Sequence, residues 1–131
     1  MFDDLSSGDI VLIDGSHSAH MGSDVVVAFT EVLPKLPTGV LVGIDDIFLP
    51  WNYPPSWVGR WYAEQYLLAV LLLSADPHWN VVFPAWWVAH DPTLAASVDP
   101  LRDPAKTTMG TLGTTLWMER LVSRPEPPQT A

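Results

Sequence analysis

The sequence predicts an α/β fold built on a parallel β-sheet with flanking helices. The run IVLI at residues 10–13 is continuously apolar and rich in β-branched residues, which is typical of a short strand buried on both faces of a parallel sheet. A second apolar run at 40–44 predicts its neighbour. Between them, apolar residues at helical spacing predict a helix that Ser23 or Asp24 caps and that Pro34 and the turn 37–39 close. This order predicts a right-handed crossover between two parallel strands.

The rest of the chain predicts further elements of the same domain. They are an ordered loop rich in proline and aromatic residues at 48–55, a helix at 56–74, a strand at 80–88 that Pro84 assigns to a strand end or a sheet edge, and a last strand at 113–122 whose side chains alternate between two faces. Residues 90–109 predict irregular or weakly helical structure. We expect residues 1–123 to form one domain and residues 124–131, RPEPPQTA, to form a disordered tail.

Composition and charge disfavour several classes of function. The chain has 131 residues, of which 48% are hydrophobic, and a formal net charge of −9, which repels nucleic acid and anionic lipid. It has no cysteine, and therefore no disulfide framework and no thiolate metal site. Acidic residues stand near the N-terminus, where a secretory signal would be basic, and the longest strongly apolar stretch, 66–73, is too short to span a bilayer. We therefore expect a cytoplasmic protein without a nucleic-acid or membrane partner.

Carboxylates follow both of the first two predicted strands. Asp14 comes after the first strand, and Asp45 and Asp46 come after the second. Ligands of open parallel sheets bind beyond the carboxyl ends of the strands, so these three side chains are candidates for one pocket. Three carboxylates in one pocket repel one another unless a proton or a cation intervenes, and an oxygen-liganded ion such as Mg²⁺ is one interpretation. The alternative interpretation is that they cap helices or mark loop entries.

Two histidines lie in the loop after the first strand. His17 and His20 are placed at the same end of the sheet as the carboxylates, and a histidine there can accept a proton from a substrate hydroxyl near neutral pH. We favour His17 as the candidate general base. The alternative is that both histidines are solvated polar residues of the loop, since neither has metal-site spacing to another histidine.

Aromatic residues cluster in and after the loop 48–55. Trp51, Tyr53 and Trp57 are candidates for the wall of a small-molecule pocket, and core packing is the alternative for this group and for Trp61. Within the predicted helix, Glu64 needs a partner if it is buried. The helical spacing favours a structural pair between Glu64 and Arg60 over a site role for Glu64.

The order of motifs resembles one family. The motifs are GDIVLIDGSH, LPKLPTGVLVGIDDIFLPWNYPPSW, WYAEQYLLAVLLL, VVFPAWWVAHDP and GTLGTTLWMER. In this order they resemble the carboxyl-terminal half of the class I, Rossmann-like S-adenosylmethionine-dependent methyltransferases over roughly residues 8–122. The resemblance implies a partial methyltransferase sheet that supplies the fourth to seventh strands of seven, the last of them antiparallel.

The resemblance also implies roles for individual residues. Asp14, Gly15, Ser16 and His17 would lie beside the methionine end of S-adenosylmethionine, and Asp46 would lie with His17 in the catalytic pocket. The aromatic trio described above would then bind the substrate, a small hydroxylated molecule that accepts the methyl group on oxygen.

In metal-dependent members of that superfamily, acidic residues at the same strand ends bind Mg²⁺, which implies Asp14, Asp45 and Asp46 as metal ligands. The motifs are most similar to a bacterial subgroup in which a histidine-aspartate-isoleucine triplet precedes a loop rich in proline and aromatic residues and an Asn-Glu-Gln-Tyr-Leu-Leu helix. Two positions depart from that subgroup, because Asp45 stands where it has histidine and Ala63 where it has asparagine. Because of these two differences, the chemistry of the subgroup does not transfer intact to this chain.

The first half of such a domain, with its glycine-rich turn, has no counterpart in the sequence. We therefore expect strand 10–13 to form an exposed apolar sheet edge that pairs with a second copy or with a chain that supplies the missing half. Two functions follow. One is a methyltransferase half that needs such a partner, and the alternative is a non-catalytic remnant that assembles as an interaction or structural protein. A metal-dependent hydrolase is a third interpretation, which the lack of a histidine-rich ligand set disfavours.

Overall fold

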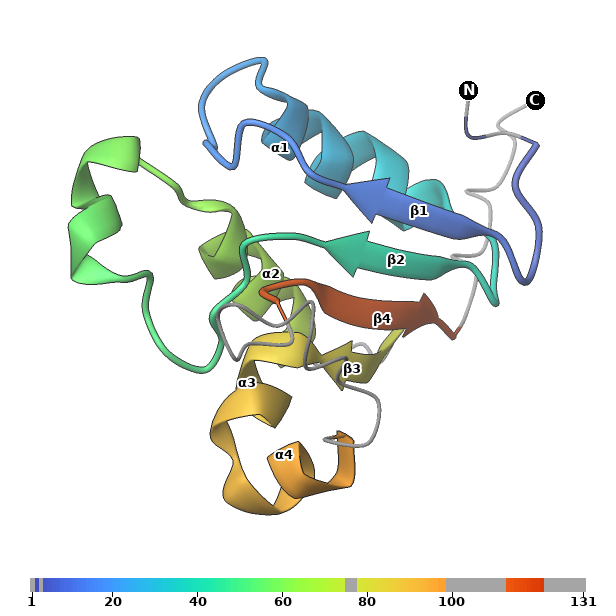
Figure 1. Ribbon diagram of the computed structural model, residues 1–131. Helices are drawn as coiled ribbons and strands as arrows, with labels where there is room; N and C mark the ends of the chain where they lie inside the picture. The colour runs from blue at the N-terminus through green and yellow to red at the C-terminus, as the bar shows by residue number, and fades with distance from the viewer. Residues whose placement is uncertain (1, 3, 75–77, 99–112, 122–131) are drawn as a thin grey trace, which may run out of the picture.

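The computed structural model describes residues 2, 4–74, 78–98 and 113–121 (Figure 1). Within these residues, four strands form one sheet in the order β1-β2-β4-β3. The strands are β1 (Ile10–Ile13), β2 (Leu41–Ile44), β3 (Trp79–Pro84) and β4 (Leu116–Arg120). β1 runs parallel to β2, whereas β4 runs antiparallel to both β2 and β3. The α/β class, the parallel pair and the antiparallel last strand are therefore confirmed.

The segment between β1 and β2 is helical, as expected. It consists of α1 (Asp24–Val27), a π-helical turn (Ala28–Val32) and a 3-10 turn (Leu33–Lys35). The Ser23 hydroxyl caps α1 by accepting the backbone N–H of Val26 at 3.2 Å. Pro34 has no N–H to continue the α-helical pattern, and Gly39, at a φ of +82°, makes the turn into β2.

One face of the sheet carries the core. The strand register pairs Val11 with Val42 and Val42 with Met118, so these side chains share a face. Leu33 packs against that face from the connection between β1 and β2, and Leu68 packs against it from α2 (Glu64–Leu73). The buried cluster comprises Val11, Leu33, Leu36, Val40, Val42, Ile44, Ile47, Leu68, Leu116 and Met118.

The other face of β1 is exposed. Ile10 and Leu12 are 62% and 60% exposed, and β1 lies at the edge of the sheet (Figure 1). The expectation of a strand buried on both faces is therefore wrong for β1, because these side chains point away from the core that buries Val11. The expectation of an exposed apolar edge is confirmed.

The predicted helix 56–74 is broken in two. A 3-10 helix, Pro55–Arg60, ends at Trp61, which has a left-handed φ of +58°, and α2 begins at Glu64. A continuous helix was the wrong expectation, because the two prolines that precede Ser56 start a tight turn and Trp61 reverses the chain. The break turns the start of α2 toward the loop after β1.

The predicted strand 80–88 ends early. β3 stops at Pro84, and the chain continues as α3 (Ala85–His90) and α4 (Pro92–Val98). Residues 85–88 were wrongly assigned to a strand, whereas the edge position of β3 is confirmed. β4 alternates as expected, with Leu116, Met118 and Arg120 buried.

Residues 124–131, the expected tail, and 99–109 of the expected irregular stretch lie outside the described residues. Among the described helices, none is both long and apolar enough to cross a membrane.

Candidate functional site

The carboxyl ends of β1 and β2 and the start of α2 meet at one edge of the sheet. His17 follows β1 and Asp46 follows β2, and both adopt left-handed backbone conformations, with φ values of +55° and +54°. A non-glycine residue in this region costs roughly 1 to 3 kcal/mol, and such residues are common at functional sites. Tertiary contacts therefore hold both residues in place.

A buried histidine and a buried glutamate form the centre of the site. His17 is 4% exposed and Glu64 is fully buried, and His17 Nδ1 lies 2.8 Å from Glu64 Oε2. The backbone carbonyl of His17 also accepts the N–H groups of Ala63 at 2.8 Å and Glu64 at 3.2 Å. His17 thus caps the first turn of α2 while its ring contacts the first carboxylate of that helix. The expected pair between Glu64 and Arg60 is wrong.

The second ring nitrogen of His17 faces two aspartates. Nε2 lies 3.5 Å from Asp14 Oδ1 and 3.6 Å from Asp46 Oδ2. The Asp14 side chain is 63% exposed, whereas that of Asp46 is 19% exposed. An ionised Glu64 can only accept a hydrogen bond, so Nδ1 carries the proton and a neutral His17 has its lone pair on Nε2. Nε2 is therefore the ring nitrogen that faces Asp46 and the more exposed Asp14.

Burial perturbs the acids of the cluster. Burial raises the pKa of Glu64, and the hydrogen bond from His17 opposes this change. Burial also raises the pKa of Asp46, again against the charge of His17. Glu64 Oε1 is buried without a hydrogen-bond partner. A partly desolvated acid cluster next to an imidazole is a common arrangement for proton transfer.

Asp45 turns away from His17. Its Oδ1 accepts the hydroxyl of Thr115 at 2.7 Å and that of Thr114 at 3.3 Å, at the start of β4. In the part of the chain that the structure describes, no group of three or more His, Cys, Asp or Glu side chains is arranged to hold a metal ion. Of the three carboxylates expected to bind Mg²⁺, Asp14 and Asp46 therefore meet at His17 and Asp45 does not. We derive no chemistry through a metal.

The loop expected to bind the cofactor is tied to α1. The backbone N–H of Ser16 donates to Asp24 Oδ2 at 2.7 Å, and its hydroxyl donates to Asp24 Oδ1. These hydrogen bonds lower the pKa of Asp24. Gly15 leaves the room that the Asp24 carboxylate fills. Of the residues expected beside the cofactor, Asp14 is the one whose exposed carboxylate faces solvent. His20 is exposed, with Nδ1 3.4 Å from the carbonyl of Met21.

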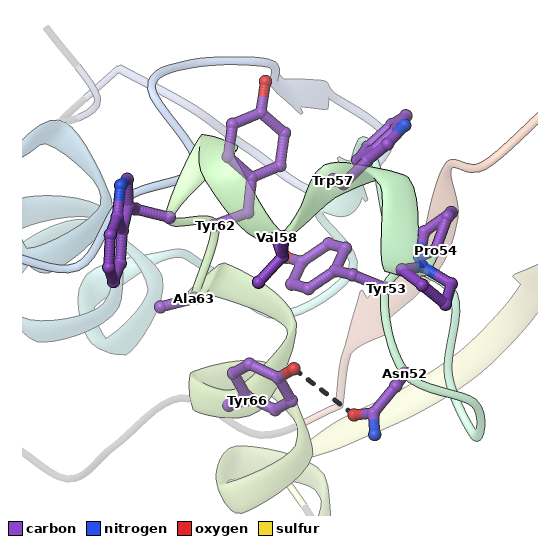
Figure 2. Close-up of a pocket in the computed structure, with 10 residues that line it drawn as sticks. Asn52, Tyr53, Pro54, Trp57, Val58, Tyr62, Ala63 and Tyr66 are labelled. Carbon is purple, nitrogen blue, oxygen red and sulfur yellow. Dashed lines mark hydrogen bonds between the residues drawn. The ribbon is translucent and has the colours of Figure 1, made fainter.

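An aromatic pocket of about 450 Å³ lies beside this cluster (Figure 2). Tyr53 and Trp57 line it, as expected for substrate-binding residues. Trp51 does not line it, because its ring is 48% exposed and lies 5.9 Å from the ring of His90. The lining residues are Asn52, Tyr53, Pro54, Pro55, Trp57, Val58, Trp61, Tyr62, Ala63 and Tyr66.

Tyr62 connects the pocket to the histidine. Its ring centroid lies 4.6 Å from that of His17 and 5.6 Å from that of Trp57. The buried Gln65 holds the loop that forms the pocket wall: its side-chain oxygen accepts the N–H of Phe48 at 3.0 Å, and its own N–H donates to the Tyr53 hydroxyl at 3.1 Å. Burial raises the pKa of Tyr53 to about 12.

Neither Tyr62 nor the partnership of Glu64 with His17 was predicted from the sequence. The one local signal for Glu64 was a carboxylate in an apolar helix, which indicated a buried partner without naming it.

Comparison with known proteins found no relative of this chain. No family model matches the chain, and no curated protein and no solved structure matches it. The chemistry of the site is therefore the basis on which a function can be assigned.

Proposed function

We propose that this chain is the second half of a methyltransferase-like domain in which His17, oriented by Glu64, is the general base for O-methylation of a small hydroxylated molecule. The observation that carries the proposal is the contact of 2.8 Å between His17 Nδ1 and the buried Glu64 carboxylate, which leaves Nε2 facing Asp14 and Asp46. A base that a second group holds in one tautomer is the arrangement used by many enzymes that deprotonate hydroxyl groups.

Each charged residue of the site has a separate role in the proposed reaction. His17 Nε2 takes the proton of the acceptor hydroxyl, and the Glu64 carboxylate stabilises the imidazolium that results. Asp46, 3.6 Å from the same nitrogen, adds to this stabilisation. Solvent removes the proton afterwards by way of the exposed side of Asp14. S-adenosylmethionine, when bound, supplies an electrophilic methyl group on its sulfonium.

One residue of this site, Asp14, suits a group of the cofactor. The exposed carboxylate of Asp14 suits the ammonium group at the methionine end, whereas the polar groups of Ser16 are already engaged by Asp24. The sequence has no glycine-rich turn between a strand and a helix to hold the rest of the cofactor. We therefore propose that a different chain supplies the polypeptide that completes the cofactor site.

The tautomer of His17 is the direct test. We expect the ¹⁵N chemical shifts of the imidazole, at a pH where it is neutral, to show a protonated Nδ1 and an unprotonated Nε2 in the intact chain. In Glu64→Leu the preference should weaken, because the acceptor is gone. A neutral His17 protonated on Nε2 in the unsubstituted chain would remove the proposed base.

Cofactor binding tests the second part of the proposal. Calorimetric titration of the chain by itself with S-adenosylmethionine should show no tight binding, with or without Mg²⁺. Micromolar binding by this chain would contradict the need for additional polypeptide.

A second candidate function is assembly without catalysis, and the edge of β1 favours it. The carbonyls of Asp9 and Ile13 accept the N–H groups of Leu41 and Asp45, in and after β2. Because the hydrogen bonds of a strand alternate in direction, the backbone groups of Ile10 and Leu12 face away from β2. Together with two exposed apolar side chains, this edge suits the addition of another strand, from a second copy or from a different chain. Light scattering that shows a monomer at micromolar concentration would leave the self-association form of this candidate without support.

A further inference from the structure

We propose that the aromatic pocket selects an acceptor that carries a positive charge, and that the class it takes is a hydroxylated aromatic amine. The inference rests on the proposed function in one respect, which is that the pocket is treated as the acceptor site. The charge preference itself is a property of binding and does not depend on the cofactor.

The walls of the pocket are mainly the faces and edges of aromatic rings. Tyr53 contacts Trp57, Tyr62 and Tyr66 at centroid distances of 6.4, 5.9 and 5.7 Å. Figure 2 shows the Tyr66 hydroxyl directed at Asn52, to which it donates at 3.3 Å. The Tyr66 hydroxyl and the Asn52 amide are therefore already paired, and the ring faces of the wall favour an aromatic ligand over a sugar with many hydroxyl groups.

A cation already lies against these rings. The Arg60 guanidinium carbon is 3.9 Å from the centroid of the Trp57 ring and 5.6 Å from that of Tyr62. Aromatic faces carry partial negative charge and attract cations, more so where water is excluded. Arg60 is exposed, and no carboxylate of the described residues forms a salt bridge with it, so the ring faces of Trp57 and Tyr62 are what it contacts.

Negative charge lies directly beyond the pocket wall. Tyr62 lines the pocket and contacts the ring of His17, which lies next to the carboxylates of Asp14, Asp46 and Glu64. The charges of Glu64 and Asp46 contribute to the raised pKa of Tyr53, so their field reaches the pocket wall. Three ionised carboxylates outnumber the positive charges of His17 and Arg60, so the region is negative and repels carboxylates and phosphates.

The test uses three phenols of similar size that differ in charge: tyramine, 4-ethylphenol and 4-hydroxyphenylacetate. Binding to the full chain is followed by the shifts of backbone and indole N–H signals of residues in the pocket wall. We expect tyramine to bind about ten-fold more tightly than 4-ethylphenol, and the anion to bind more weakly than both. Equal affinities, a preference for the anion, or no binding of tyramine at millimolar concentration would each overturn the proposal.

Asp46→Asn and Glu31→Gln form a matched pair of variants. Each removes one negative charge, and asparagine tolerates the left-handed conformation of Asp46. Glu31 is exposed on the π-helical turn and takes no part in the site. We expect Asp46→Asn to reduce the preference for tyramine over 4-ethylphenol to about three-fold, and Glu31→Gln to leave it unchanged. The same reduction in both variants would mean that net charge, and not the site, sets the preference.

Failure of this inference and failure of the proposed function are distinguishable. If His17 is protonated on Nε2 but tyramine is preferred, the pocket is a cation-selective site without the proposed base. If the tautomer is as expected and the three phenols bind alike, the base stands and the charge selectivity does not.

Discussion

Replacement of Glu64 by leucine tests whether the buried carboxylate organises the site. Glu64 is fully buried, and it is the acceptor for His17 Nδ1 at 2.8 Å. Leucine has a similar volume and no acceptor, so the imidazole loses this partner. Glutamine keeps an acceptor oxygen at the same place and is the matched control.

The expected size of the effect comes from three contributions. An unsatisfied buried donor costs about 1 to 3 kcal/mol, and loss of an acidic group from the first turn of α2 costs about 0.3 to 1 kcal/mol. Removal of a carboxylate whose Oε1 has no partner offsets part of this. At acidic pH, below the raised pKa of Glu64, we expect Glu64→Leu to lower the free energy of unfolding by about 2 kcal/mol and Glu64→Gln to change it by about 0.5 kcal/mol or less.

Urea unfolding followed by tryptophan fluorescence measures the difference. With a slope of about 2 kcal/mol per molar urea, the midpoint of the leucine variant should fall by about 1 M relative to wild type. Identical midpoints for the leucine and glutamine variants would refute the reasoning, because the acceptor for His17 would then make no contribution to the fold.

Three further perturbations have defined outcomes. Because the pKa values of Glu64 and Asp46 are raised in the folded state, the stability that these groups contribute is full below their ordinary values of 4.5 and 3.8 and is lost as the pH rises through the raised values. Glu64→Gln should therefore gain stability relative to wild type as the pH increases toward neutrality, and a pH-independent difference in urea midpoints would contradict this sign. Gly43→Ala should destabilise the chain by about 1 to 3 kcal/mol in thermal unfolding, because the new Cβ would lie 2.8 Å from atoms of the Trp117 ring, and an unchanged Tm would mean that the ring moves freely. Leu12→Lys, at a position that is 60% exposed on β1, should reduce any self-association seen by light scattering with little change in stability, whereas unchanged association would place the contact elsewhere.

The sequence predicted the elements that depend on local pattern. The apolar runs that became β1 and β2, the cap at Ser23 and the edge position of β3 were all visible along the chain. Because parallel strands end at one edge of a sheet, the meeting of Asp14, His17 and Asp46 was also predictable in outline.

Helical spacing misled the interpretation where the backbone changes direction. The pairing of Arg60 with Glu64 assumed a continuous helix, and the left-handed Trp61 separates the two residues. Arg60 lies on the ring of Trp57 instead. Because the chain changes direction at Trp61, Arg60 and Glu64 do not lie on one helix and do not form the expected pair.

What the sequence determined by itself was the class of fold and the edge of the sheet where polar residues gather. Only the tertiary structure decided that Glu64 contacts His17 across 47 positions of sequence, that Asp45 turns to Thr115, and that Tyr62 contacts the histidine while lining an aromatic pocket. The physical reason is that periodicity reports which face of an element is apolar, whereas the partner of a buried polar group depends on how distant elements pack together.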